Sequence, residues 1–258
     1  MKPLSVAIEA ALAGGAVLKS YFGGNFRISY KGEVDLVTQA DTESEQEVIS
    51  ILQRRLPDVS ILAEESGAQD ADVARRFIID PLDGTTNFLH GIPIFSVSIA
   101  LERNGEIVAG VVYNPAMDEL YTAEKGGGAF MNDRRLRVAA RRVLSDTVIS
   151  TGVPHLGRGH HGKYLVELRN VMGEVAGIRR LGSVALDLAF VAAGRVDGFW
   201  EEGLNAWDIA AGLLLVREAG GFASDKTGGR DMLESGGIVA GNEHIHKALL
   251  DVLKKPVS

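Results

Sequence analysis

Hydrophobic residues recur at helical spacing twice in the N-terminal part of the chain. The first stripe consists of Leu4, Ile8, Ala11, Leu12 and Leu18. Side chains three and four residues apart share one face of an α-helix, so this stripe predicts an amphipathic helix that ends at Gly23 and Gly24. A second stripe between residues 48 and 56 follows Thr38 and Asp41, which are suited to cap a helix. The chain is therefore expected to begin with two amphipathic helices.

The pattern then changes to short apolar runs of strand length. Residues 60–63 and 76–79 are such runs, and each leads directly into acids: Glu64 and Glu65 after the first, Asp80 after the second. Between residues 94 and 138, strand-like segments at 95–102, 107–113 and 119–123 are separated by turn residues. This region predicts a mostly antiparallel meander, and the acids before it are expected at strand ends.

The second half of the chain alternates between strand-like and helix-like segments. We expect strands at 147–150 and 197–200, helices at 163–175, 183–193 and 206–219, and short strands up to residue 240. No linker rich in proline, serine or charge separates the halves. We therefore expect an N-terminal α+β lobe, residues 1–145, and a C-terminal α/β lobe, residues 146–258, that form one compact unit with a shared cleft.

Composition narrows the class of protein. The 258 residues carry a formal net charge of −7, which disfavours sequence-independent binding to nucleic acid. The absence of cysteine excludes disulfides and thiolate metal sites and favours a cytoplasmic location. Glu9 interrupts the apolar N-terminus, so a helix is expected there rather than a signal peptide. No uncharged apolar run approaches the ~18 residues of a membrane span, so no membrane partner is expected.

The most informative stretch, residues 80–88, reads Asp-Pro-Leu-Asp-Gly-Thr-Thr-Asn-Phe. Pro81 stiffens a turn in which Asp80 and Asp83 can aim their carboxylates at one point, and such oxygen ligands suit Mg²⁺. Gly84 lets the backbone approach a ligand, and the threonines after it can begin a helix whose free N–H groups favour a phosphate. The same residues are common in ordinary turns, and Asp208 alone would be an ordinary acid at a helix N-terminus. Alone, the stretch leaves both interpretations open.

Together with other segments, this stretch resembles the inositol monophosphatase family. The matching segments are Lys31, Val34-Asp35-Leu36-Val37-Thr38 with Asp41, Ala63-Glu64-Glu65-Ser66, Asp80 to Phe88, Gly182-Ser183, Glu201-x-Gly203-Leu204 and Trp207-Asp208-Ile209-Ala210. A set of motifs spread over almost the whole chain is much more specific than any one of them. The resemblance implies an α+β fold, the layered α-β-α-β-α sandwich shared with fructose bisphosphatases, and a homodimer.

The resemblance also implies roles for individual residues. Two or three Mg²⁺ ions per active site are implied, with Glu64, Asp80, the Leu82 carbonyl, Asp83 and Asp208 as ligands. Asp80 would be shared between two ions, and Thr85, paired with Glu64, would help to position and deprotonate the attacking water. The implied substrate-binding residues are Gly84, Thr85, Ser183, Val184, Glu201, Asp208 and Lys31. Of these, Glu201 would bind a hydroxyl of the alcohol.

The implied reaction is the hydrolysis of a small phosphate monoester without a covalent phosphoenzyme. Two cations a few ångströms apart cancel the charge that makes the phosphate dianion repel a nucleophile, and they stabilise the leaving alkoxide. Because Glu201-x-Gly203-Leu204 looks like the inositol-type subgroup, myo-inositol monophosphates are the first expected substrates and inhibition by Li⁺ is implied. Val184 stands where that subgroup commonly has alanine. Relatives that act on fructose 1,6-bisphosphate, histidinol phosphate or adenosine 3′,5′-bisphosphate share the metal motifs, so these substrates stay open.

An alternative from another class is a transcription-associated accessory protein, as some bacterial members of the family are. One dense basic stretch consists of Arg134, Arg135, Arg137, Arg141 and Arg142. Charges on an edge strand discourage aggregation, which makes a solvated edge strand the simpler interpretation, and a surface for RNA or a protein partner is the alternative. The complete acidic set favours catalysis, because a scaffold has no physical need of it.

Overall fold

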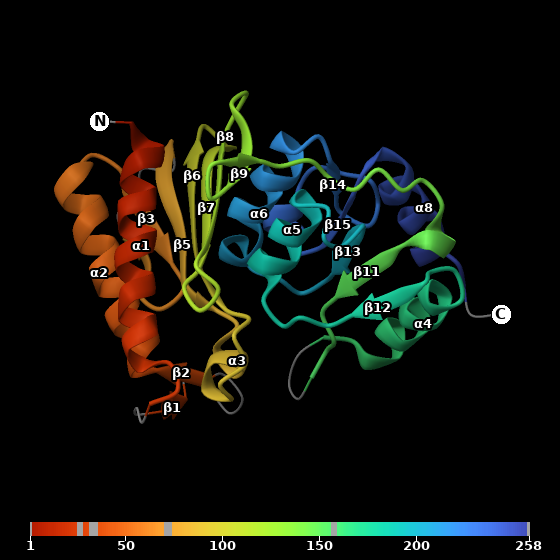
Figure 1. Cartoon of the computed structure of the whole chain (residues 1–258), viewed down its shortest axis with the longest axis horizontal. Coiled ribbons are helices and arrows are strands. Elements are labelled where there is room, and N and C mark those ends of the chain that lie inside the picture. Colours follow the sequence, from red (N-terminus) through yellow and green to blue (C-terminus); the bar gives the residue numbers. More distant parts are fainter. Residues whose placement is uncertain (1, 25–27, 31–35, 70–73, 156–158, 257–258) are drawn as a thin grey trace.

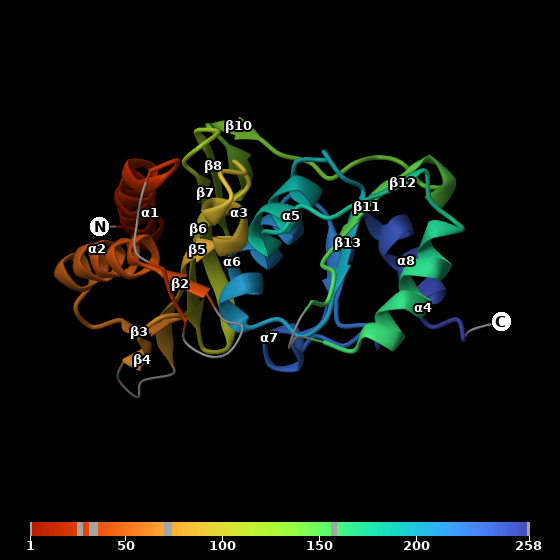
Figure 2. The same ribbon diagram turned by 90° about the horizontal axis from the view of Figure 1, so that it is seen from below.

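A computed structural model describes residues 2–24, 28–30, 36–69, 74–155 and 159–256 of the chain. Their helices and strands lie in five layers, in the order helices, sheet, helices, sheet, helices (Figures 1 and 2). The expected α-β-α-β-α sandwich is thus confirmed. The larger sheet uses strands up to residue 135 and the smaller begins at residue 148. The lobe boundary after residue 145 stays a prediction.

The outer helical layer of the N-terminal half consists of α1 (Pro3–Tyr21) and α2 (Gln39–Arg55). Small residues let α1 lie close to its neighbours: a Cβ added at Gly14 would lie 2.7 Å from Val48 of α2, and one at Gly15 would lie 2.5 Å from the Tyr113 ring. The α2 helix begins at a capping box in which Thr38 and Asp41 each accept from the other's backbone N–H. Both predicted helices are therefore confirmed.

The larger sheet has eight strands in the order β10-β9-β8-β7-β6-β5-β3-β4. Their bounds are β3 Ser60–Ala63, β4 Gly67–Gln69, β5 Arg75–Asp83, β6 Ser96–Arg103, β7 Glu106–Asn114, β8 Glu119–Glu124, β9 Gly128–Met131 and β10 Arg134–Arg135. Strands β6 to β10 form the predicted antiparallel meander, which β5 extends by pairing antiparallel with β6, and β3 alone pairs parallel with β5. β10 lies at the edge of the sheet, as the simpler interpretation of the arginine stretch predicted. A separate two-stranded ribbon joins β1 (Ile28–Tyr30) to β2 (Leu36–Thr38).

The middle layer consists of α5 (Val184–Ala192) and α6 (Ala206–Glu218). In α6 every residue from Ile209 to Val216 is buried, as expected for a helix with a sheet on each side. Glycines permit the closest approaches: a Cβ on Gly110 of β7 would lie 3.0 Å from the Ala211 carbonyl oxygen, and one on Gly212 would lie 2.5 Å from Leu188 of α5. This layer brings the N-termini of α5 and α6 to the edge where β5 ends.

The second sheet has the order β12-β11-β13-β15-β14 and is followed by the last helical layer (Figure 1). Its strands are β11 Val148–Thr151, β12 Gly177–Arg179, β13 Gly198–Glu201, β14 Phe222–Ser224 and β15 Ile238–Gly241. The remaining helices are α3 Thr85–Leu89, α4 His161–Met172, α7 Met232–Ser235 and α8 Glu243–Leu253. The sequence analysis did not predict α8, which begins at a side-chain cap from Asn242.

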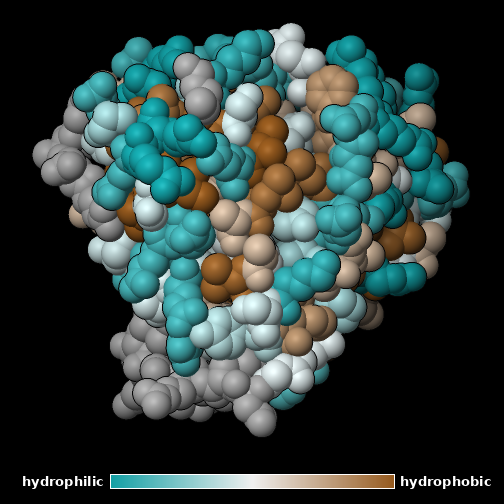
Figure 3. Space-filling view, turned by 60° about the vertical axis from the view of Figure 1, so that its left-hand side comes forward, coloured by the Kyte–Doolittle hydropathy of each residue, from teal (hydrophilic) through white to brown (hydrophobic). Residues whose placement is uncertain are grey.

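Among the described residues, α1 is the one helix that is long and apolar enough, by length and composition, to cross a membrane. In this fold its buried residues, such as Val6, Ala10 and Leu18, pack into the core between the first helical layer and the larger sheet. The core helix of a globular protein passes the same test of length and composition. The view that brings this end of the molecule forward shows a mostly hydrophilic surface with a central band of hydrophobic residues (Figure 3).

Candidate active site

The end of β5 places two carboxylates in the interior. Asp80 and Asp83 are 2% and 8% exposed, and the strand register shifts between them, at the position of Pro81. Asp80 Oδ1 accepts from the backbone N–H of Leu82 at 2.9 Å, and the Pro81 carbonyl accepts from the Ser44 hydroxyl of α2 at 3.1 Å. These bonds fix the segment from both sides, but it is an irregular end of strand β5 rather than the expected turn, because residues 80–83 all belong to the strand.

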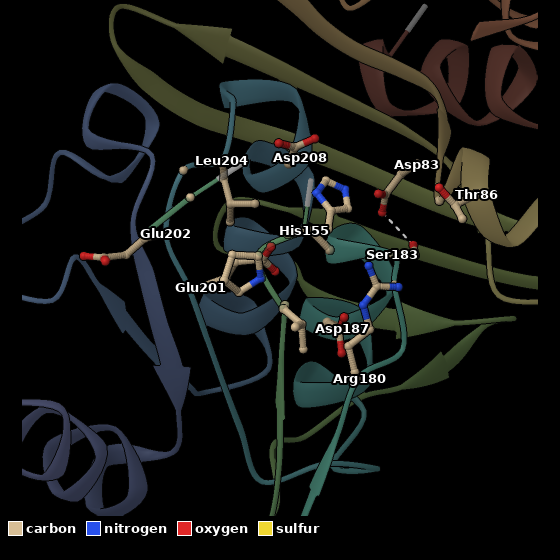
Figure 4. Close-up of a pocket in the computed structure, with 18 of the residues that line it drawn as sticks. Asp83, Thr86, His155, Arg180, Ser183, Asp187, Glu201, Glu202, Leu204 and Asp208 are labelled. Atoms are coloured by element: carbon tan, nitrogen blue, oxygen red, sulfur yellow. Dashed lines mark hydrogen bonds between the residues drawn. The ribbon is translucent and has the colours of Figure 1, made fainter. Parts of the chain in front are cut away.

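Asp83 joins the two halves of the molecule. Its Oδ2 accepts from the Ser183 hydroxyl at 2.6 Å and from the backbone N–H of Ala185 at 2.7 Å (Figure 4). Both donors belong to the N-terminus of α5, where unpaired backbone N–H groups favour an anion. Burial nevertheless outweighs these hydrogen bonds and raises the pKa of Asp83 to about 6. The Asp83 carboxylate is therefore held in place by hydrogen bonds, but its negative charge is not fully compensated.

Gly84 and Thr85 form the turn into the short helix α3. Gly84 has φ 94°, and a Cβ there would lie 2.9 Å from the Ile94 carbonyl oxygen. The Thr85 hydroxyl lies 3.1 Å from the Leu82 carbonyl and 3.3 Å from Asp41 Oδ1. The carboxylate that the structure gives to Thr85 is thus Asp41, whereas the resemblance led us to expect Glu64. The pairing of Thr85 with Glu64 stays a prediction.

The third carboxylate comes from the N-terminus of α6. Asp208 is held by a capping box, because its Oδ2 accepts from the backbone N–H of Asn205 at 2.7 Å. One carboxylate oxygen from each of Asp80, Asp83 and Asp208 lies within 4.8 Å of the others. Burial first, and then repulsion from Glu64, Asp83 and Asp208, raises the pKa of Asp80 well above its usual range. Three acids distant in sequence therefore meet at one point.

Glu64 approaches this cluster from the neighbouring strand. β3 and β5 are parallel, with Ala63 at the end of β3 opposite Ile79, and the Glu64 N–H donates to the Ile79 carbonyl at 3.1 Å. The carboxyl ends of parallel strands point to one edge of a sheet. The prediction of acids at strand ends is confirmed for Glu64, which follows β3, whereas Asp80 lies within β5, whose last residue is Asp83.

The carboxylates line a cavity of about 300 Å³ between the two sheets. Across it, Glu201 at the end of β13 lies directly against Gly152, where an added Cβ would be 1.9 Å from the Glu201 carboxyl carbon. Figure 4 shows Glu201 on the side of the pocket away from Thr86, and Asp187 and Arg180 between Glu201 and Ser183. One end of the cavity thus carries the carboxylates that suit a metal ion, and the other end carries further polar side chains.

Ten of the predicted site residues line this one cavity. They are Glu64, Asp80, Leu82, Asp83, Gly84, Thr85, Ser183, Val184, Glu201 and Asp208. Lys31 lies outside the described residues. The individual roles of all these residues stay predictions, because their proximity does not assign a ligand to any of them.

Sequence reasoning missed several residues of the site. Asp41 was noted as a helix cap and a family match, but not as the partner of Thr85. Tyr164, Arg180 and Asp187 line the cavity without having been singled out, and Gly152 is required by the position of Glu201. The available signal for Asp187 was a single acid within the apolar run 184–192.

The donor set fits a hard divalent cation. Mg²⁺ takes carboxylate and carbonyl oxygens, and the cluster offers three carboxylates from separate elements. Burial raises the pKa values of Asp80 and Asp83, with repulsion from neighbouring carboxylates adding to it at Asp80, and bound Mg²⁺ would offset that cost. The same geometry suits a phosphate oxygen, which can complete the coordination of the cation.

Comparisons with known proteins find similar sequences and structures along almost the whole chain. Residues 2–257 match a family model described as the inositol monophosphatase family. A protein named inositol-1-monophosphatase from Mesorhizobium japonicum is 65% identical over 99% of this chain and 97% of its own length. A protein named Nus factor SuhB from Pasteurella multocida is 45% identical over 99% of this chain and 97% of its own length. The crystal structure of extragenic suppressor protein suhB from Bartonella henselae is 57% identical, covers 98% of both chains and has a TM-score of 0.95.

Proposed function

We propose that this chain, which belongs to the inositol monophosphatase family, is an Mg²⁺-dependent phosphatase that hydrolyses myo-inositol monophosphates to inositol and phosphate. The observation that carries the proposal is the convergence of Asp80, Asp83 and Asp208 at one end of a cavity, with Glu201 at the other. Metal ligands at one end and a hydrogen-bond acceptor at the other suit a substrate with a phosphate on one side and hydroxyl groups on the other.

The metal would be held by the acidic end. We assign one Mg²⁺ to Glu64, Asp80 and the Leu82 carbonyl and a second to Asp80, Asp83 and Asp208. When bound, Mg²⁺ supplies positive charge that offsets the phosphate dianion and stabilises the leaving oxygen. In the absence of a covalent phosphoenzyme, a water molecule attacks phosphorus directly.

The chain's own residues position that water. The Thr85 hydroxyl lies between Asp41 Oδ1 and the Leu82 carbonyl, so it can donate to either and accept a hydrogen bond from water. Asp41 is 1% exposed, and its burial raises its pKa, which makes it a better proton acceptor than an exposed carboxylate. We propose that Thr85 orients the water and that Asp41 takes up its proton through the hydroxyl.

Recognition of the alcohol falls to the other end of the cavity. Glu201 is half-buried at the end of β13, and its carboxylate can accept hydrogen bonds from an inositol hydroxyl. Ser183 and Val184 line the same space from the N-terminus of α5. Asp83 accepts a hydrogen bond from a backbone N–H of that N-terminus, so a hydrogen bond connects the phosphate and alcohol ends of the cavity.

The test is a panel of phosphate monoesters assayed with saturating Mg²⁺. The panel contains myo-inositol 1-phosphate, fructose 1,6-bisphosphate, histidinol phosphate, adenosine 3′,5′-bisphosphate and p-nitrophenyl phosphate. We expect the highest kcat/KM for inositol 1-phosphate. A higher value for another member would reassign the substrate, and no phosphate release from any member would refute the phosphatase.

A role beside transcription is the second candidate. It is favoured by the 45% identity to a protein named Nus factor SuhB and by exposed Arg134, Arg135 and Arg142 along one edge of the molecule. Co-purification of RNA or RNA polymerase subunits with the parent protein, and its loss when these arginines become serine, would support that role. A homodimer and a cytoplasmic location also stay proposals, and size-exclusion chromatography tests the first.

A further inference from the structure

Asp187 is a buried carboxyl group with one oxygen left unsatisfied. It lies in the first turns of α5 and is 1% exposed. Its Oδ1 has no hydrogen-bond partner among the described residues. The N-terminus of α5 is already capped, because Ser183 accepts from the Leu186 N–H and Asp83 accepts from the Ala185 N–H. Asp187 therefore contributes neither a cap nor a hydrogen bond from Oδ1.

Two further buried polar atoms lie on the wall of the same cavity. The indole N–H of Trp200 and the hydroxyl of Tyr164 make no hydrogen bond of good geometry with the described residues, although the Thr151 side chain lies close enough to offset part of the rise in the pKa of Tyr164. Their rings stack with centroids 6.5 Å apart and an interplanar angle of 19°. Tyr164, Asp187 and Trp200 all line the cavity that holds Glu201. One acceptor and two donors are thus left unused around one space.

Groups of this kind are costly to the folded protein. A polar atom that leaves water without gaining a hydrogen bond destabilises the fold, and a carboxylate does so most. Burial first, and then the negative charges of Glu201 and Asp83, raise the pKa of Asp187 well above its usual range, and the Ser150 hydroxyl and the charge of Arg180 offset this rise only in part. Figure 4 shows Asp187 beside Arg180 on the Ser183 side of the pocket. A role in ligand binding accounts for such groups where a role in folding does not.

We propose that Asp187 determines specificity: together with Tyr164 and Trp200 it binds hydroxyl groups of the substrate's alcohol half, and so selects phosphate esters of polyhydroxylated alcohols. This inference rests on the proposed phosphatase function. A polyol hydroxyl both donates and accepts, so it can satisfy the carboxyl of Asp187 and the N–H and O–H donors facing it. An alcohol without hydroxyl groups would leave all three atoms unsatisfied.

The test compares Asp187→Leu with the parent protein on two substrates. We expect the ratio of kcat/KM for myo-inositol 1-phosphate to that for p-nitrophenyl phosphate to fall by roughly tenfold or more, because only the inositol ester loses hydrogen bonds. We also expect the melting temperature to rise, because an apolar side chain replaces an unsatisfied carboxyl in a buried helix. Asp187→Asn keeps a polar group and should lose less of the ratio.

Asp197 offers a matched control. It is another buried carboxyl of the same half, but it is fully used: Oδ1 accepts from Arg141 at 3.0 Å and Oδ2 from the Val148 N–H at 2.9 Å. Asp197→Leu should therefore lower the melting temperature and leave the substrate ratio unchanged.

The inference is overturned if Asp187→Leu lowers the melting temperature and leaves the ratio at the parent value, which is the behaviour of a structural residue. Should that variant fail to fold, Tyr164→Phe replaces it, since it removes one hydroxyl and keeps the ring stack. A parent-like ratio in Tyr164→Phe would then overturn the inference. A parent protein that hydrolyses neither ester would instead refute the proposed function itself.

Discussion

Replacement of Asp83 by asparagine separates its two contributions, charge and hydrogen bonding. Asp83 Oδ2 accepts from the Ser183 hydroxyl at 2.6 Å and the Ala185 N–H at 2.7 Å. The carbonyl oxygen of asparagine can accept both bonds, so the link between β5 and α5 should persist. The variant loses only the negative charge, and with it a ligand that the proposed second Mg²⁺ requires.

The expected effect on stability follows from the pKa. Burial raises the pKa of Asp83 from 3.8 to about 6 in the metal-free protein. A carboxyl whose pKa is raised on folding contributes stability that is fully present below pH 3.8 and is lost as the pH rises through about 6. The rise of about two units corresponds to ~3 kcal/mol. The metal-free Asp83→Asn protein should therefore be more stable than the parent by up to that amount above this pH window.

Activity should change in the opposite direction. Loss of a residue that only orients a metal ligand typically costs ~10–100-fold in activity or metal affinity, so loss of a ligand charge should lower kcat/KM by more than ~100-fold. Saturating Mg²⁺ should stabilise the parent more than the variant, because binding to the folded state alone raises the free energy of unfolding. The asparagine variant is thus expected to be the more stable metal-free protein and the weaker enzyme.

The assay combines thermal unfolding of the metal-free proteins between about pH 4 and 8 with phosphate release at saturating Mg²⁺. Near-normal hydrolysis by Asp83→Asn would refute its assignment as a metal ligand. A metal-free stability gap that narrows as the pH rises would refute the electrostatic argument.

Three other substitutions test the rest of the site. Glu201→Gln should lower the kcat/KM ratio of inositol 1-phosphate to p-nitrophenyl phosphate by roughly tenfold, and equal losses on both esters would place Glu201 in metal or structural support. Gly152→Ala should lower the same ratio in steady-state assays with little change in melting temperature, because the added Cβ would lie 1.9 Å from the mobile end of Glu201, and an unchanged ratio would contradict this. Asn87 Nδ2 donates to the Ile94 and Leu181 carbonyls at 2.7 and 2.8 Å, so Asn87→Ala should remove both hydrogen bonds and leave the two carbonyls without this donor. Its cost of ~2–4 kcal/mol should lower the melting temperature in calorimetry by ~5–10 °C, and a parent-like value would show that these bonds contribute little.

The local pattern of apolar, polar and turn residues was sufficient to predict most strands of the larger sheet. The alternation and turn residues between 94 and 138 predicted the meander because each strand pairs with its sequence neighbour. Glu64 could be placed at a strand end because the run 60–63 stops at a charged residue, whereas β5 continues beyond the run 76–79, through Asp80 to Asp83. Helix α8 was missed, although its cap residue Asn242 stands directly before it.

Contacts that depend on packing could not be predicted in the same way. Asp208 could be recognised as an acid at a helix N-terminus, but its position beside Asp80 and Asp83 results from the packing of α6. Asp41 was expected as a cap, but its second oxygen reaches Thr85 through tertiary packing of α2 on the β5 turn. That Asp187 is unsatisfied is a property of its surroundings, because a sequence shows the acid and not the missing partner.

The most direct test of the account is an Mg²⁺ titration of the metal-free parent protein with myo-inositol 1-phosphate as substrate and phosphate release as the readout. The carboxylate cluster predicts no turnover after exhaustive chelation and a saturable rise in kcat/KM as Mg²⁺ is returned. Full activity in the chelated protein, or no phosphate release at any Mg²⁺ concentration, would contradict the central claim.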